Sequence, residues 1–320
     1  MIIFRFPFGS DCYTIKNNST YTDSVDFVSF DEKTKISFNG KAEKLPKSEI
    51  KSIFSSELEK TISFENEDKT QYLEKINEVI RFIKENDLKI LVISRKKSIN
   101  FTENIDLSET FLNLCEAYPN AFVYLMIKDN ECWLGAFSEI LGKFQKATSE
   151  FQTMSLAGTL PIDENWTEKE IKEQQPVTDY IHHILKNYSA EISVSKTTEH
   201  ISGKIKHLRT DFSTKIKTEK LNPLIADLHP TPAVCGVPKD FCKTAIQHFE
   251  SHDRELYSGY IRVENETEIS YFVNLRCAKI SKNELNIFVG GGITAQSQPE
   301  KEWRETELKT KAILDNLALV

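Results

Sequence analysis

The sequence predicts an α+β protein in which layered antiparallel β-sheets are flanked by helices. Two observations support this fold class: strand-like runs follow one another as neighbours joined by short turns, and helical segments separate groups of strands instead of alternating with single strands. The chain has 320 residues, of which 39% are hydrophobic and 28% are charged, a composition typical of globular proteins. We expect one domain over residues 1–320, with a β-rich part at residues 1–65.

The first part of the chain is expected to consist of strands. Residues 1–65 alternate short apolar runs with turns rich in Asn, Asp, Gly and Ser, which predicts a small antiparallel meander. The strand-like runs are Ile2 to Phe8, Tyr13 to Ile15, Val25 to Phe30 and Lys35 to Phe38. None of these runs carries a recognisable chemical motif.

Beyond this meander, helices and strands are predicted from changes in hydrophobic period. Apolar residues at helical spacing predict a helix from Tyr72 to Asn86, and the apolar run from Lys89 to Arg95 predicts a strand buried on both faces. Further helices are expected from Asp106 or Ser108 to before Pro119, from Trp166 to Lys186 with a kink or a division at Pro176, and from Lys239 to Phe249. Further strands are expected at Ala121 to Ile127, Cys132 to Phe137, residues 150–160, His200 to Phe212, Tyr257 to Val263, Ile269 to Lys279 and Leu285 to Val289.

Charge and composition exclude several classes of protein. The net charge of −7 argues against nucleic acid as the main partner, because phosphate binding requires a clustered basic surface. The longest apolar run, Ala121 to Ile127, is much shorter than the roughly 20 residues that a membrane-spanning helix needs. The N-terminus is interpreted as a strand and not as a signal peptide. The six cysteines contain no CxxC pair, so neither a zinc site nor a disulfide framework is proposed. We expect a cytoplasmic protein without an obligatory protein partner.

The stretch from Asn286 to Lys309 carries the strongest local signal for a ligand site. An apolar run enters three consecutive glycines, Gly290 to Gly292, whose backbone can approach an anion closely. On the helix that follows, Glu302, Glu305 and Lys309 fall on one face, an arrangement that suits a divalent cation bridging an acidic ligand. Taken alone, this segment is more often explained by a strand, a glycine turn and a solvated helix with an ordinary Glu–Lys pair.

A second informative stretch runs from Leu228 to Pro238. Its closely spaced prolines stiffen the backbone around His229, so the imidazole would have little freedom. Taken alone, a histidine in such a setting is more often a structural hydrogen-bonding group than a catalytic one.

In combination, these stretches resemble the chorismate-utilizing enzymes, the group that includes isochorismate synthase, salicylate synthase and the large subunit of anthranilate synthase. The resemblance extends from about residue 72 to the C-terminus through motifs in family order. They are VISR at 92–95, LGAFSE at 134–139, LAGT at 156–159, EQQPVTDYI at 173–181, LHPTPAV at 228–234, RELYSG at 254–259, NLRC at 274–277 and GGGI…EWRET…K at 290–309.

The resemblance implies a chorismate site that contains Mg²⁺. Magnesium takes oxygen ligands, and by resemblance these come from Glu173 and Glu305, with Glu302 beside them. Arg276 would grip a substrate carboxylate with two parallel hydrogen bonds, and Lys309 would add a point charge. The remaining substrate-binding residues implied by the resemblance are Thr159, His229, Tyr257, Gly290, Gly291 and Gly292.

The resemblance also implies a pair of proton-transfer residues. The hydration branch of the family adds water at ring carbon 2 while the 4-hydroxyl group leaves, which requires a general acid and a general base. Glu139 matches the acid. The base is a lysine at the start of the strand that ends in Ser94 and Arg95, but that position is Ile90 here and Lys89 lies one residue earlier. We predict Lys89 as the base, with a one-residue β-bulge between Lys89 and Ser94 that turns its side chain toward the site; an end-of-strand surface position is the alternative.

Three functions are therefore open from the sequence. The first is an isochorismate synthase working for menaquinone or siderophore supply. The second is another chorismate enzyme, of the salicylate or anthranilate synthase type. The third is a chorismate-binding protein that has lost catalysis, which the offset of Lys89 and the short N-terminal region suggest.

Overall fold

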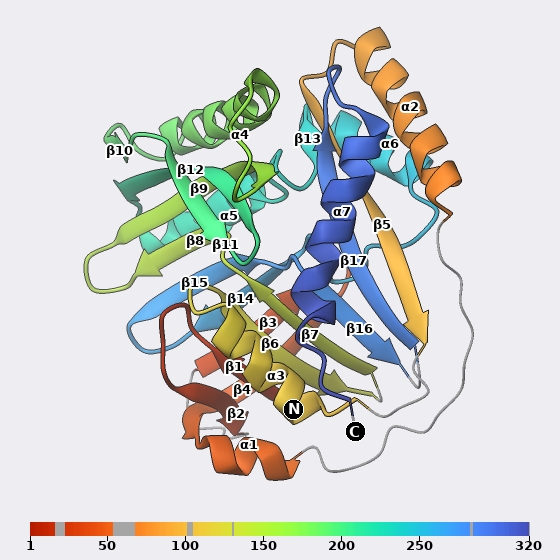
Figure 1. Ribbon diagram of the computed structural model, residues 1–320. Coiled ribbons are helices and arrows are strands. Elements are labelled where there is room, and N and C mark those ends of the chain that lie inside the picture. The colour runs from red at the N-terminus through yellow and green to blue at the C-terminus, as the bar shows by residue number, and fades with distance from the viewer. Residues whose placement is uncertain (17–22, 54–67, 101–104, 130, 282–283, 320) are drawn as a thin grey trace.

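The computed structural model describes residues 1–16, 23–53, 68–100, 105–129, 131–281 and 284–319 (Figure 1). Its strands form two antiparallel sheets. In the first sheet the neighbours are β13 (Gly236–Val237), β5 (Ile90–Asn100), β17 (Glu284–Ile293), β16 (Cys277–Ser281), β7 (Glu131–Phe137), β6 (Phe122–Lys128), β1 (Ile2–Arg5), β2 (Cys12–Lys16) and β4 (Lys35–Leu45).

The second sheet begins on the same β4, which pairs with β2 through its C-terminal half and with β3 through its N-terminal half. From β4 the order is β3 (Asp23–Val28), β14 (Tyr260–Glu264), β15 (Glu268–Val273), β8 (Ile140–Gln145), β9 (Glu150–Pro161) and β12 (Ile205–Lys215). Strand β12 also pairs with β10 (Ile192–Val194) and β11 (Thr198–Ser202). A single strand therefore joins the two sheets.

Helices cover the outer faces of both sheets. They are α1 (Lys47–Ile53), α2 (Lys69–Glu85), α3 (Leu107–Ala117), α4 (Glu168–Lys186), α5 (Leu221–Leu228), α6 (Lys239–Phe249) and α7 (Pro299–Leu314). Residues of α1, α3 and α7 share one apolar cluster with the first sheet, and residues of α4 and α5 share another with the second sheet. A third cluster places α2 and α6 against β5, and a fourth, rich in aromatic rings, lies between the sheets. The predicted α+β class with flanking helices is confirmed.

Several predicted elements agree closely with the structure. The helix predicted to begin at Asp106 or Ser108 is capped by Asp106, whose carboxylate accepts the backbone N–H of Glu109. Helix α6 has the predicted bounds. The strands predicted in residues 1–65 are present as β1 to β4.

Other predictions are corrected by the structure. Of the two alternatives predicted at Pro176, the division is excluded: helix α4 continues through Pro176, and its buried face, which includes Val177 and Ile181, packs against β9 and β12 on the C-terminal side of the proline. The single strand predicted at His200 to Phe212 is a hairpin that turns at Gly203, whose φ is 63°. The glycines 290–292 are strand residues of β17 paired with residues 92–94 of β5, not a turn.

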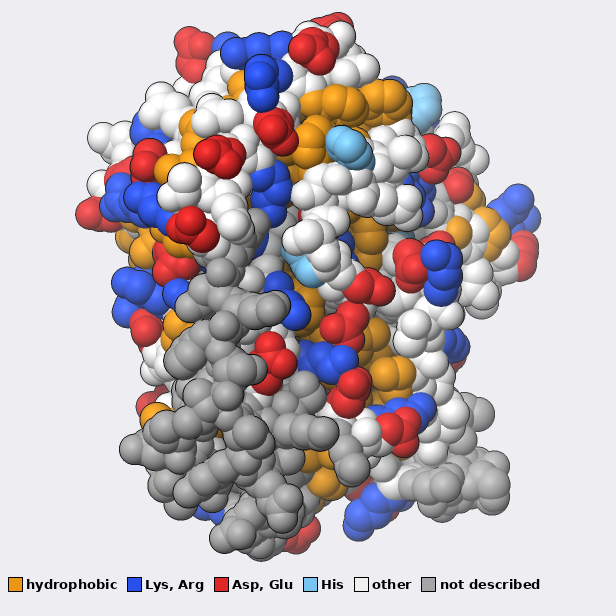
Figure 2. Space-filling view, turned by 90° about the vertical axis from the view of Figure 1, so that its right-hand side faces the viewer, with side chains coloured by type: hydrophobic (Ala, Val, Ile, Leu, Met, Phe, Trp, Pro, Cys, Tyr) orange, Lys and Arg blue, Asp and Glu red, His pale blue; other side chains and the backbone are white. Residues whose placement is uncertain are grey.

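Side chains of both charges occur together on the surface. On the face shown in Figure 2, Lys and Arg side chains are interspersed with Asp and Glu. None of the helices that the structure describes has the length and apolar content that a membrane-crossing helix requires.

Candidate active site

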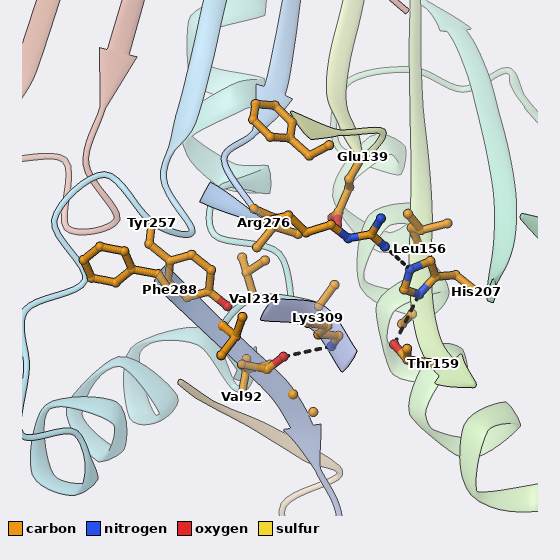
Figure 3. A pocket seen from close by; sticks show the side chains of 18 of the residues that line it. Val92, Glu139, Leu156, Thr159, His207, Val234, Tyr257, Arg276, Phe288 and Lys309 are labelled. Carbon is orange, nitrogen blue, oxygen red and sulfur yellow. Dashed lines mark hydrogen bonds between the residues drawn. The ribbon is translucent and has the colours of Figure 1, made fainter. Parts of the chain in front are cut away.

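A cavity lies between the two sheets and beneath α7, where motifs far apart in the sequence meet (Figure 3). We call it the inner cavity, and its volume is about 80 Å³. Strands β5 and β17 supply one wall, β9 and β12 supply the opposite wall, and α4 and α7 contribute one charged side chain each. Of the predicted site residues, the cavity is lined by Glu139, Thr159, Glu173, Tyr257, Arg276, Gly290, Gly291, Gly292 and Lys309.

The three glycines line the cavity, and a side chain would be most crowded at Gly290 and Gly292. A Cβ atom on Gly290 would lie 2.9 Å from the Tyr257 hydroxyl oxygen, and one on Gly292 would lie 2.9 Å from Oε1 of Glu173. At Gly291 the nearest atom would be Oε1 of Glu305, at 3.3 Å. The groups that come close to this glycine run are side chains of the protein, and its backbone is a strand. The predicted approach of an anionic ligand to these glycines stays a prediction.

Glu139 is a buried carboxyl group in the corner between β7 and β8. Its side chain lies near the guanidinium of Arg276 (Figure 3). Burial raises the pKa of Glu139 to about 8, against the opposing effect of the positive charges of Lys309 and Arg276. Glu139 is consequently protonated at neutral pH and can donate a proton into the cavity.

The guanidinium of Arg276 is held in place by hydrogen bonds with His207 and Ser202, two residues that were not predicted as part of the site. Its Nη2 lies 2.7 Å from Nε2 of His207, and its Nη1 donates to the hydroxyl of Ser202. The other ring nitrogen of His207 lies 3.1 Å from the carbonyl oxygen of Gly158. Burial, and then the charge of Arg276, hold the pKa of His207 well below its usual value. A neutral ring that donates from Nδ1 to Gly158 accepts the Arg276 N–H at Nε2.

A signal for His207 was present in the sequence. It is a polar residue in the strand-like segment IKHLRTDF, and its cross-strand partner is Thr159 of the LAGT motif. The pairing of β12 with β9 was needed to see that these two residues face one cavity.

Acidic residues of α4 and α7 form a carboxylate cluster, which we define as Glu173, Glu302 and Glu305. All three are deeply buried. The Lys309 ammonium donates to Oε1 of Glu305 at 2.7 Å and to the Gly290 carbonyl at 2.8 Å. The ammonium of Lys169 lies 3.2 Å from Glu173 and 3.3 Å from Glu302.

The donor atoms of this cluster suit Mg²⁺. All are carboxylate oxygens, the ligand type that magnesium prefers, and Oε2 of both Glu173 and Glu302 is buried without a hydrogen-bond partner. Burial raises the pKa of Glu302 to about 7 despite the positive charge of Lys169. In the described residues, no three His, Cys, Asp or Glu side chains are already arranged to hold an ion. The chemistry fits a divalent cation, but binding would require the side chains to move.

The structure contradicts the role predicted for Lys89. Strand β5 starts at Ile90 and its register with β17 runs regularly from Leu91 to Asn100, which leaves no bulge to redirect Lys89. The Lys89 side chain is 67% exposed and its nearest charged partner is Asp87, at 3.9 Å. Because side chains alternate along a strand, it is Val92 that reaches the cavity from β5. Lys89 is therefore a surface residue.

His229 is also outside the inner cavity. It is 1% exposed, its ring packs against Phe30 and Tyr260, and neither ring nitrogen has a hydrogen-bond partner. Burial lowers the pKa of His229 to about 3, so the ring is neutral. The predicted substrate contact is replaced by a core position beside the cis His229–Pro230 peptide bond.

Two larger cavities adjoin the inner one from outside. The first, which we call the outer cavity, has a volume of about 450 Å³ and contains Lys169, Glu302 and Glu305 in its lining. Thr159 lines both the inner and the outer cavity. A second space of about 250 Å³ also has Arg276 and Lys309 in its lining. The inner cavity therefore shares charged or polar lining residues with both larger cavities.

Comparison with known proteins places this geometry in context. Residues 10–318 match the family model described as chorismate binding enzyme. The chain is 30% identical over 245 residues to isochorismate synthase EntC of Escherichia coli, an alignment that covers 72% of this chain and 62% of that protein. The chain thus spans about three fifths of the length of this curated relative.

Two solved structures have the same fold. A putative 2,3-dihydroxybenzoate-specific isochorismate synthase, DhbC of Bacillus anthracis, superposes with a TM-score of 0.81 at 21% identity and covers 98% of this chain and 95% of its own. Anthranilate synthase component I of Streptococcus pneumoniae gives a TM-score of 0.72 at 16% identity, covering 94% of this chain and 83% of its own. At these identities the likeness concerns the fold alone.

Proposed function

Because this chain belongs to the family of chorismate-binding enzymes, we propose that it is an isochorismate synthase that converts chorismate into isochorismate with the help of Mg²⁺. The observation that carries the proposal is that three kinds of group meet at the inner cavity and its border with the outer cavity. They are the protonated carboxyl group of Glu139, the cationic side chains of Arg276 and Lys309, and the buried acidic oxygens of the carboxylate cluster. Each kind corresponds to one requirement of the reaction.

Substrate binding would use the cationic side of the inner cavity. The guanidinium of Arg276 is oriented by His207 and Ser202, so it can form two parallel hydrogen bonds to a carboxylate without first losing rotational freedom. Lys309 extends from α7 toward Gly290 and would add a second positive charge. Val92, Leu156 and Phe288 supply apolar surface for the ring.

Proton transfer to the leaving group is proposed for Glu139. The 4-hydroxyl group of chorismate needs a proton as its bond to carbon breaks, and Glu139 holds one at neutral pH. A general acid is most effective when its pKa is near the working pH, and a pKa of about 8 meets that condition.

Magnesium would be held by Glu173 and Glu305, with Glu302 beside them. When bound, the ion would neutralise one carboxylate of the substrate and fix its orientation. The contribution of the protein is to present buried oxygens on α4 and α7 that lack full hydrogen-bond partners. A cytoplasmic location and the absence of an obligatory protein partner stay predictions.

A second candidate function is chorismate binding without catalysis. The observation that favours it is the surface position of Lys89, since attack by water requires a base. Among the described residues that line the inner cavity, Lys309 is the one lysine, and it is engaged by Glu305 and Gly290. This candidate shares the substrate and the metal with the first and differs in turnover.

One experiment separates these functions. The purified protein is incubated with chorismate and Mg²⁺, and the products are identified by chromatography and proton NMR, with a chelator in the control. Isochorismate that forms with Mg²⁺ and not with chelator supports the proposal. Salicylate would assign a different enzyme of the family. If a thermal shift shows that chorismate binds while no product forms, the protein is a binding protein, and full activity in chelator contradicts the role of magnesium.

A further inference from the structure

The ammonium group of Lys169 lies against two carboxylates of the carboxylate cluster. The ammonium is 3.2 Å from Oε2 of Glu173 and 3.3 Å from Oε1 of Glu302, and these two side chains are only 6% and 2% exposed. We propose that Lys169 is a resident counter-cation, which offsets part of the negative charge of the carboxylate cluster in the ligand-free protein and leaves it when a divalent cation binds. The inference rests on the proposed magnesium dependence and adds to it an exchange of partners.

Charge balance explains why such a cation is present. Three buried carboxylates without compensation would be costly, because removing a charge from water is repaid only by close opposite charge. Lys309 is already engaged by Glu305. Burial by itself would lower the pKa of Lys169, but Glu173, Glu302 and Glu305 raise it, so its ammonium stays charged. Lys169 therefore stabilises the ligand-free cluster.

The fit between Lys169 and the cluster is incomplete. Oε2 of Glu302 has no hydrogen-bond partner, and Oε2 of Glu173 is near the ammonium without forming a well-directed hydrogen bond. An ammonium carries one charge and three donors on a flexible stem. Mg²⁺ carries two charges and binds carboxylate oxygens at about 2.0–2.1 Å, so it can satisfy oxygens that the lysine leaves unmatched. Exchange of the one cation for the other would also bring the cluster, with Lys309, to neutrality.

The outer cavity offers space into which the Lys169 side chain can move. Lys169 lines the outer cavity, whereas Glu173 lines the inner cavity, so the ammonium stands at the boundary between the two. Thr167 and Glu170 form a capping box that fixes the start of α4. The backbone can therefore stay in place while the four-carbon side chain turns into the outer cavity, leaving its place on the cluster to the incoming ion.

The alternative is that Lys169 permanently positions the carboxylates, also when metal is bound. The two roles differ in the sign of one effect. If Lys169 competes with the ion, its removal strengthens metal binding. If Lys169 positions the ligands, its removal weakens metal binding.

The decisive test uses the full chain and Mg²⁺ alone, without chorismate. The affinity for Mg²⁺ is measured by isothermal titration calorimetry for the wild type, Lys169→Met and Lys172→Met. Lys172 is a matched control because it lies on the same helix and pairs with Glu168 at the surface. We expect Lys169→Met to bind Mg²⁺ roughly tenfold more tightly, since the ion no longer displaces charged hydrogen bonds. Lys172→Met should bind like the wild type.

A second measurement on the wild type covers the case in which Lys169→Met fails to fold. Lysines are acetylated with a water-soluble reagent, and the extent of modification of Lys169 is measured by mass spectrometry. Mg²⁺ should increase the labelling of Lys169 severalfold and leave that of Lys172 unchanged. Equal or weaker Mg²⁺ binding by Lys169→Met, or labelling that Mg²⁺ lowers or does not change, would overturn the inference while the proposed function stands. A wild type that binds no Mg²⁺ would overturn both.

Discussion

Two buried groups of charges lie on either side of strand β5, and they differ in how completely they are satisfied. In the first, Arg254 donates to both carboxylate oxygens of Glu250 and to the carbonyls of Val234 and Val92, while Glu250 also accepts the backbone N–H of Ser94. In the second, the carboxylate cluster, two buried oxygens have no hydrogen-bond partner.

This difference separates a structural role from a functional one. The Arg254 guanidinium opposes the effect of burial and holds the pKa of Glu250 below its usual value, so the pair is stable as it stands. In the carboxylate cluster, burial raises the pKa of Glu302 to about 7. A natural protein rarely leaves buried polar atoms unmatched. Here the unmatched atoms are oxygens of two carboxylates that share the counter-cation Lys169 at the border of the two cavities, a setting that suits a cationic ligand. The following predictions test that distinction, from the largest expected effect to the smallest.

Glu305→Ala should remove catalysis without unfolding the protein. If the carboxylate cluster exists to hold Mg²⁺, loss of one ligand should lower turnover of chorismate about a thousandfold or more, because the ion supplies several kcal/mol of charge stabilisation. The measurement is the steady-state rate at saturating Mg²⁺, with thermal unfolding as a control. A variant that loses stability in proportion to activity would place Glu305 in the same structural class as Glu250.

Arg254→Leu should show the opposite behaviour. Removing one partner of a buried ion pair leaves the other charge uncompensated, which typically costs about 3–5 kcal/mol of the free energy of unfolding. Urea denaturation measures this loss, and Lys172→Met serves as a surface control that should change stability by less than about 0.5 kcal/mol. A loss below about 1 kcal/mol would mean that full hydrogen bonding does not mark the structural cluster.

Arg276→Ala should act on substrate binding. The guanidinium is oriented by His207 and Ser202, and loss of its charged hydrogen bonds to a substrate carboxylate should raise the Michaelis constant for chorismate about 10- to 100-fold. Arg276→Lys should recover only part of the loss, since an ammonium cannot form two parallel hydrogen bonds. An unchanged Michaelis constant in the alanine variant would remove Arg276 from the binding site.

The dependence of turnover on pH should report Glu139. Its pKa is raised to about 8, first by burial, so the protonated acid is present below that pH and is lost as the pH rises through it. Turnover should therefore fall above about pH 8. Between the ordinary carboxyl pKa and about 8, the folded state keeps this proton and the unfolded state does not, so the free energy of unfolding should decrease as the pH rises over that range. Rate measurements from pH 6 to 9.5 test this. Glu139→Gln should be much slower and should not show the fall.

Lys89→Gln should have the smallest effect. Its side chain is exposed and its partner Asp87 is at the surface, so stability should change by less than about 0.5 kcal/mol and turnover should not change. A variant that binds chorismate but no longer turns it over would restore the original assignment of Lys89 as the base and show that the strand shifts when substrate binds.

The sequence predicted those features that depend on local pattern or on motifs in order. Helix α6 and the start of α3 follow from hydrophobic spacing and a capping residue. The meeting of Glu139, Arg276 and Lys309 followed from the family resemblance and not from local spacing, since these residues are far apart along the chain. Residues 1–320 as one domain stays a prediction.

The features that could not be predicted depend on pairing between distant strands. A shift of one residue along β5 decides whether Lys89 or Ile90 faces the cavity, and no local signal fixes it. The glycines of β17 are poor strand formers, but close contact with Tyr257, Glu173 and Glu305 requires them there. The position of His207 in the site depends on the pairing of β12 with β9, which places it opposite Thr159.

The strands of residues 1–45 have a consequence for how the protein resists aggregation. This region carries none of the sequence motifs named above, yet β1 lies along the edge of β6 and β3 lies along the edge of β14. A shortened chain that kept only the recognisable motifs would present both strands as bare edges, with rows of unpaired N–H and C=O groups that invite another molecule to add to the sheet. A part of the chain that carries no active-site motif thus protects the sheets from association with their own copies.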